Sequence, residues 1–337
     1  MKLKKIISVA VGAAMLCASL PFSSTTVDFV KDNVITANAE DEMPSSGKCG
    51  DNVYYSLSDD GVLTISGSGD MASTIVGGYL FPGSIKSVVI EDGITSIGSC
   101  AFYGYSELTS ISIPNSVNSI SDDAIFDCIN LTNITIPDSV TSIGGGVFYN
   151  CTNLENIIIP ESVTSIGSFT PDCGATFEGT KWLENKRKEN PLVVVNNILI
   201  DGKTCSDDVI IPNYVTLINE NAFYGCTNLS SVSIPDSVTS IGSSAFSGCI
   251  SLTNITIPNS ITSIGDNAFC HCSNLTNIII PDSVTSIGSS AFSGCINLSN
   301  ISISNSVTTI GGDAFYDTKW LENKQKENSL FIVNNIL

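Results

Sequence analysis

A 23-residue unit recurs nine times along this chain of 337 residues. The copy at residues 131–153 reads LTNITIPDSVTSIGGGVFYNCTN and follows the pattern L-x-x-I-x-I-P-x-S-V-x-x-I-G-x-x-A-F-x-x-C-x-x. A fixed period of this size is typical of a stacked solenoid, in which each unit contacts only its neighbours. We therefore expect a functional surface along an extended face, without a cleft. The copies begin at Ile85, Leu108, Leu131, Leu154, Ser206, Leu229, Leu252, Leu275 and Leu298.

The start of each unit alternates apolar and polar residues, which predicts a short strand. In the copy quoted above, Asn133 and Thr135 point outward, and Pro137 ends the strand because it has no N–H for the ladder. Gly144 is expected to permit a turn. One strand per unit, always in the same direction, predicts a parallel sheet. The expected core residues are Leu131, Ile134, Ile136, Val140, Ile143, Val147, Phe148 and Cys151.

Residues 1–39 read as a signal peptide. Lys2, Lys4 and Lys5 form a positive start, and residues 6–20 form an apolar run too short for a typical membrane span. Ala37-Asn38-Ala39 then offers a cleavage site. We expect export, a secreted or cell-surface location, and no membrane insertion after cleavage.

Residues 40–84 are expected to form a polar leader and an N-terminal β cap. The stretch YYSLSDDGVLTISGSGDM, residues 54–71, alternates apolar and polar residues around Asp60-Gly61, which is a strong hairpin signal. Stacked repeats need a terminal unit that covers the first core layer. This segment is placed to be that unit.

The repeats span residues 85–317 and are interrupted by an insert near residues 177–205. Thr180 can cap a short helix that ends before Pro191. Glu184 and Lys188 stand four residues apart, as in a helical ion pair.

A hairpin is predicted after this helix. Its strands are Leu192–Val195 and Ile198–Ile200, joined by Asn196-Asn197, which tolerates a positive φ. Residues 318–337 repeat the insert and stop one strand into the second hairpin. We interpret them as a truncated helix-hairpin module, from a fragment or a poorly capped end.

The charge of the chain disfavours two classes of partner. Without residues 1–39, which hold four lysines and two aspartates, 10 basic and 31 acidic residues remain of the 14 and 33 in the full chain. A strongly acidic protein repels nucleic acid and anionic membranes. Most of the remaining positive charges lie in the two helical segments, beside Trp182 and Trp320, which form a second candidate surface or plug their helices onto the stack.

The cysteines of the repeat indicate packing rather than disulfide bonding. Six of them recur at one position of the repeat, and Tyr105 fills that position in the first unit, which indicates that the position requires a side chain of some volume. We expect buried, reduced thiols at this position. They are Cys128, Cys151, Cys226, Cys249, Cys272 and Cys295.

No set of residues predicts catalysis or a cofactor. His271 is the one histidine, and it has no candidate catalytic partner beyond its own repeat. Cys270-His271-Cys272 lacks the spacing and the second cluster of a zinc site, so we expect no metal. Acidic residues that follow the strand prolines could form a calcium row, but a solvated edge is the simpler interpretation. They are Asp138, Glu161, Asp236 and Asp282.

The outward strand positions are the most informative ones for function. They are rich in hydroxyl and amide groups, which suit weak multivalent contact with a polymer or a protein. The alternative is that they are only solvent residues compatible with a strand. Candidate binding residues are Ser110, Ser112, Asn133, Thr135, Asn156, Ser231, Ser233, Asn254, Thr256, Asn277, Asn300 and Ser302, with Ile158 and Ile279 at further outward positions.

The repeat pattern resembles the BspA-like bacterial leucine-rich repeats. The segments CGDNVYYSLSDDGVLTISGSGDM and TKWLENKRKENPLVVVNNILIDGKTC are similar to segments found with those repeats in secreted bacterial proteins. The resemblance extends from Cys49 to the C-terminus. It implies a right-handed leucine-rich-repeat solenoid, and a surface or secreted role in adhesion and binding.

We therefore predict a non-enzymatic, exported binding or adhesion protein. Its partner is expected to be a host protein or an extracellular polysaccharide, recognised through the strand face of the solenoid. A structural component of the cell surface is the second hypothesis, and a secreted hydrolase is a distant third.

Overall fold

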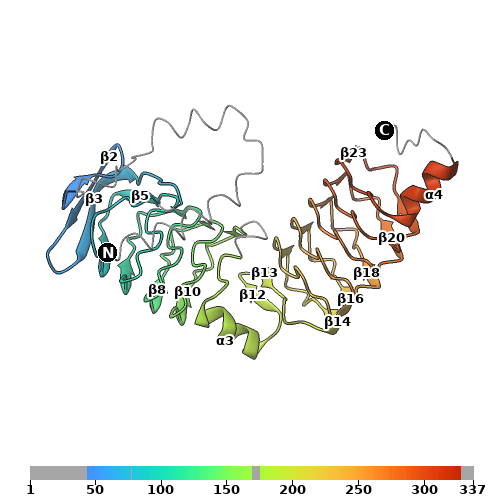
Figure 1. Ribbon diagram of the computed structural model, residues 1–337, viewed down its shortest axis with the longest axis horizontal. Coiled ribbons are helices and arrows are strands. Elements are labelled where there is room, and N and C mark those ends of the chain that lie inside the picture. Colours follow the sequence, from blue (N-terminus) through green and yellow to red (C-terminus); the bar gives the residue numbers. More distant parts are fainter. Residues whose placement is uncertain (1–43, 77, 169–174, 328–337) are drawn as a thin grey trace, which may run out of the picture. The chain divides into compact units, whose positions relative to one another are not determined.

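The computed structural model describes residues 44–76, 78–168 and 175–327. The chain divides into two compact units, one up to Ile158 and one from Ile159 onward. Figure 1 shows coils stacked side by side within each unit. The expected signal peptide and the second hairpin, residues 328–337, lie outside the described residues.

Unit one begins with an antiparallel meander. It consists of β1 (Ser46–Lys48), β2 (Asn52–Leu57) and β3 (Val62–Asp70). The predicted hairpin is confirmed, because Leu57 pairs with Leu63 around Gly61, whose φ is +82°. β3 then pairs in parallel with β4 (Ser87–Ile90) and β5 (Ile94–Ile97), so the meander covers the first coil.

Two parallel ladders follow in this unit, and we call them the front ladder and the back ladder. The front ladder contains β4, β6 (Ser110–Ser112), β8 (Asn133–Thr135) and β10 (Asn156–Ile158), with β4 paired to β6 and β8 paired to β10. The back ladder contains β5, β7 (Ser119–Ile120) and β9 (Ser142–Ile143). The strands of the front ladder are the ones predicted from the repeat, and their parallel pairing is confirmed.

The back ladder adds a second strand to each coil, only two residues long in β7 and β9, which the repeat pattern did not predict. Its hydrogen bonds run from one coil to the preceding one: Gly144 N donates to Ile120 O at 2.8 Å, and Thr141 N donates to Asn118 O at 3.1 Å. Two residues are too short a run for period-two alternation to appear. Stacking of the repeated coils nevertheless aligns the N–H groups of one coil with the C=O groups of the preceding coil.

Unit two contains β11 (Ser165–Ile166) and then the helix-hairpin insert. Helix α3 spans Lys181–Glu189, and Thr180 Oγ1 accepts a hydrogen bond from Leu183 N at 3.1 Å, which confirms the predicted cap. The strands β12 (Val193–Val195) and β13 (Ile198–Asp201) are antiparallel, with positive φ at both asparagines of the turn. Lys188, expected to pair with Glu184, donates instead to Asn185 Oδ1 at 3.3 Å.

The insert starts the ladders of unit two. On the back, β13 is followed by β15 (Leu217–Ile218), β17 (Ser240–Ile241), β19 (Ser263–Ile264), β21 (Ser286–Ile287) and β23 (Thr309–Ile310). On the front, β14 (Asp207–Ile210), β16 (Leu229–Ser233) and β18 (Asn254–Thr256) form one sheet, and β20 (Asn277–Ile280) and β22 (Asn300–Ile303) form another. Helix α4 (Lys319–Glu327) follows β23.

The core consists of columns of identical side chains, as predicted. All eight core residues expected in the copy from Leu131 to Asn153 are buried. In unit two, Phe223, Phe246, Phe269, Phe292 and Phe315 stack with ring centroids 4.9 to 5.7 Å apart. The six cysteines of the repeat column are buried and free of disulfides, which confirms that their role is packing.

Gly144 has a different role from the one that we expected. A Cβ at this position would lie 2.5 Å from Asp122 N of the preceding coil, so glycine is required for close approach of two backbones. The left-handed turn residue lies two positions later, at Gly146, with φ of +64°. Asp123, Asn221 and Ser244 hold the equivalent turn position in other coils, also with positive φ.

Candidate functional site

The outward side chains of the front ladder form two columns in unit one. In the first column, Ser87 pairs with Ser110, and Asn133 with Asn156. The asparagines are linked, since Asn156 Nδ2 donates to Asn133 Oδ1 at 2.8 Å. The second column consists of Val89, Ser112, Thr135 and Ile158.

Unit two repeats the two columns over five strands. Asp208, Ser231 and Asn254 are register neighbours in the first column, and Asn277 and Asn300 continue it. The second column consists of Ile210, Ser233, Thr256, Ile279 and Ser302. The columns are thus rich in amide and hydroxyl groups, which donate and accept hydrogen bonds.

Eleven of the twelve predicted binding residues are exposed. Ser231 is half-buried and donates to Asp208 Oδ1 at 2.5 Å. Sequence reasoning gave too little weight to the aliphatic members of the second column: Ile158, Ile210 and Ile279 have exposed fractions of 62%, 77% and 67%. The sequence pattern identified Ile158 and Ile279 as outward positions. Ile210 was missed because its repeat opens atypically at Ser206.

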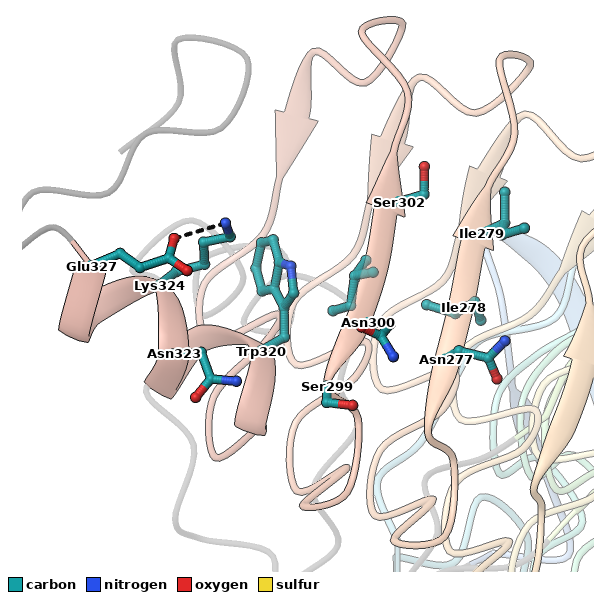
Figure 2. Close-up of a pocket in the computed structure, with 11 residues that line it drawn as sticks. Asn277, Ile278, Ile279, Ser299, Asn300, Ser302, Trp320, Asn323, Lys324 and Glu327 are labelled. Carbon is teal, nitrogen blue, oxygen red and sulfur yellow. Dashed lines mark hydrogen bonds and ion pairs between the residues drawn. The ribbon is translucent and has the colours of Figure 1, made fainter.

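A groove of about 440 Å³ lies where the front ladder of unit two meets α4. Figure 2 shows Trp320 standing between the helix and β22, with Asn300 and Ser302 on the strand. Asn323, Lys324 and Glu327 of α4 form the opposite side. Three predicted binding residues, Asn277, Asn300 and Ser302, therefore meet the predicted tryptophan surface here. The other nine remain distributed along the two units.

Trp182 and Trp320 are equally buried, and Trp320 packs on Phe315 with ring centroids 5.0 Å apart, so it is the paired charges that distinguish the surface at Trp182. Trp182 is buried and packs on Phe177 with ring centroids 4.8 Å apart. Arg187 donates to the carboxylates of Glu178 and Asp201, and Lys203 Nζ also donates to Glu178 Oε2 at 3.1 Å. Two cations thus neutralise two carboxylates, leaving little charge for a ligand.

The Cys270-His271-Cys272 segment does not converge on one point. His271 is exposed with φ of +59°, Cys270 is half-buried, and Cys272 belongs to the buried column. Among the described residues, no three His, Cys, Asp or Glu side chains are placed to hold a metal ion. The acidic residues that follow the strand prolines, Asp138, Glu161, Asp236 and Asp282, are exposed.

No helix within residues 44–76, 78–168 and 175–327 combines the length and apolar character that crossing a membrane requires.

Comparisons with solved structures found several bacterial proteins. A leucine-rich cell surface protein of Faecalibacterium prausnitzii is 26% identical, with 83% of this chain and 94% of that chain covered and a TM-score of 0.42. A leucine-rich repeat protein of Eubacterium ventriosum is 22% identical, with coverages of 81% and 95% and a TM-score of 0.43. The pneumococcal vaccine antigen PcpA is 17% identical, with coverages of 86% and 92% and a TM-score of 0.43. No curated protein matches the chain.

The family is established by the sequence of the repeats. The family model described as the BspA-type leucine-rich repeat region matches residues 74–181 and 202–323, in six copies. These two segments make up more than half of the chain, and they contain both front ladders and every strand of the two back ladders except β13. The chain therefore belongs to the BspA-type leucine-rich repeat family.

Proposed function

We propose that this protein is an exported, non-enzymatic binding protein that recognises an extracellular protein or polysaccharide through the outward columns of its front ladders. The observation that carries the proposal is the exposure of amide and hydroxyl side chains in register, for example Asn133 beside Asn156 and Ser233 beside Thr256. Export is supported by the positively charged start and the apolar run at the N-terminus.

The repetition of the columns suits a repetitive or extended ligand. Neighbouring strands lie about 4.8 Å apart, so equivalent side chains offer the same contact at each step. A single hydrogen bond contributes only about 1 kcal/mol net, but several made together to one chain raise the effective concentration of each further contact. The exposed isoleucines of the second column add apolar area to this polar face.

Four lysine substitutions test the face. In the variant that combines Asn133→Lys, Thr135→Lys, Asn254→Lys and Thr256→Lys, we expect loss of saturable binding to arrays of glycans and extracellular-matrix proteins. All four side chains are exposed, so circular dichroism should remain unchanged.

The matched control places the same four charges on the other side of the coils. It combines Thr141→Lys, Thr239→Lys, Thr262→Lys and Thr285→Lys, all at exposed positions beside the back ladder. The control should bind like the natural chain. An equal loss of binding in both variants would show that the added charge alone is responsible, and it would reject the front ladders as the binding face. Self-assembly into sheets without any ligand would favour the structural role instead.

A further inference from the structure

Helix α4 begins where another front strand would begin. Leu321 follows Leu298 by one 23-residue period, and Trp320 N donates to Leu298 O at 2.8 Å. Thr318 Oγ1 then accepts a hydrogen bond from Leu321 N at 3.2 Å, which caps a helix and turns the chain away from β22. The helix therefore takes the place of a strand.

The first insert shows the same substitution. Its coil contributes β13 to the back ladder, where β13 pairs with β15. The front ladder of unit two begins only with β14, one coil later. A helix that contains KWLENK thus precedes the front ladder of unit two and also follows its last described strand.

Within the part of the chain that the structure describes, no strand lies beside the second edge of β22. In coils with a following neighbour, the backbone of this edge is used: Ile136 N donates to Ile158 O, and Ile211 N donates to Ser233 O, both at 3.0 Å. Ile303 is the equivalent residue in β22, and Ile301 faces the same way because alternate residues share a direction. Among the described residues, β20 is the one strand that pairs with β22.

The groove described above is lined by β22, by its paired neighbour β20 (Asn277, Ile278 and Ile279) and by α4. Trp320 and Ile301 are among its apolar members. The amides of Asn300 and Asn323 and the hydroxyl of Ser302 are among its polar members. Lys324 Nζ bonds to Glu327 Oε2 at 3.0 Å, so the charged residues of the helix side neutralise each other (Figure 2).

We propose that this groove binds an extended, uncharged segment of another polypeptide, which adds as a parallel strand beside β22. Backbone hydrogen bonds to the open edge would provide affinity, and side chains at alternate positions would provide specificity. The inward residue of the ligand lies over Trp320 and Ile301 and is aliphatic. Its outward residues continue the columns of Asn300 and Ser302, which favours small polar or β-branched side chains.

The protein's own repeat supplies the probe. A blocked peptide with the sequence LTNITIP, as in residues 131–137, has the required alternation. We expect saturable binding to the full chain, measured by calorimetry. In a Trp182→Phe background, the emission of Trp320 should shift on binding, because Trp320 is then the only tryptophan.

Backbone methylation separates strand addition from other binding. Peptides methylated on the amides that face β22 should bind at least tenfold more weakly. Peptides methylated on the intervening amides should bind like the parent. Equal affinity for the two sets would overturn the proposal, since it would mean that no ladder forms.

Filling the groove provides the second arm. Asn323 is exposed on α4, and Asn323→Trp should lower the affinity at least tenfold. Gln325→Trp, the same change at an exposed position of α4 that does not line the groove, should leave peptide binding intact. Unchanged binding by Asn323→Trp, or binding only after removal of residues 328–337, would also overturn the proposal. Binding of glycans or matrix proteins is scored separately with the lysine variants, so the two proposals fail independently.

Discussion

Arg187 and Asp201 form a paired contact between helix α3 and strand β13: Arg187 Nε donates to Asp201 Oδ1 at 2.9 Å, and Nη2 donates to Oδ2 at 2.7 Å. The side chain of Asp201 is only 2% exposed. The second copy of the insert has Tyr316 and Gln325 where the first has Glu178 and Arg187, so two of the four members of this ion cluster are replaced there by uncharged residues.

We expect Arg187→Gln to destabilise unit two by about 3–5 kcal/mol, because it leaves the buried carboxylate of Asp201 without its partner. Arg187→Lys should recover only part of this loss, since lysine cannot donate in the same planar pair. Urea unfolding measures the effect, and Lys188→Gln, an exposed neighbour, is the control. Equal stability of Arg187→Gln and Lys188→Gln would show that the cluster contributes nothing net.

Asp123 should make the stability of unit one depend on pH. Burial, and secondarily the neighbouring Asp122, raises the pKa of Asp123 from 3.8 to about 6, and no described residue donates a hydrogen bond to its Oδ1. Because the folded pKa lies above the unfolded value, the stability associated with this group is greatest below pH 3.8 and is lost as the pH rises to about 6.

Asp123→Asn should therefore raise the melting temperature at pH 7 but not at pH 3.5. Asparagine already holds the equivalent left-handed position at Asn221 and Asn267. The pKa difference corresponds to at most about 3 kcal/mol at pH 7. Asp138→Asn, at an exposed site, should show no such dependence. A pH-independent gain would assign the effect to packing and not to ionisation.

The cysteine column should be chemically silent in the folded protein. Burial raises the pKa of Cys151 to about 12, and its Sγ donates to Ile125 O at 3.0 Å. Alkylation followed by mass spectrometry should leave the six column cysteines unlabelled until the chain is unfolded. Cys270 is half-buried and should react before them. Recovery of neighbouring column cysteines as disulfide pairs would contradict this expectation.

Glycines at the close approach of coils should resist substitution. A Cβ at Gly242 would lie 2.6 Å from Glu220 N, and backbone cannot move aside as a side chain can. We expect Gly242→Ala to destabilise unit two by about 1–3 kcal/mol, as other overpacked sites do. Gly312 has open space at its Cβ position, so Gly312→Ala is the matched control. Chemical denaturation compares the two, and equal stability would mean that neighbouring coils can shift apart at no cost.

Local rules and the repeat period were sufficient to predict most of the fold. The period indicated stacked coils, and its alternation separated Ile134 from Asn133 and Thr135, because successive strand residues point to opposite faces. The Asp60-Gly61 hairpin, the Thr180 cap and the Asn196-Asn197 turn were also predicted, since each depends on residues only a few positions apart.

The features that the sequence did not reveal depend on residues brought together by stacking. The back ladder, the close approach at Gly144, the contact of Arg187 with Asp201, and the groove beside Trp320 all join neighbouring coils or a helix to a strand. A repeat pattern specifies which side chains face inward within a unit. By contrast, the depth of a groove and the partner of a buried charge are determined by how a non-repeating helix packs on the stack, which only the tertiary structure decides.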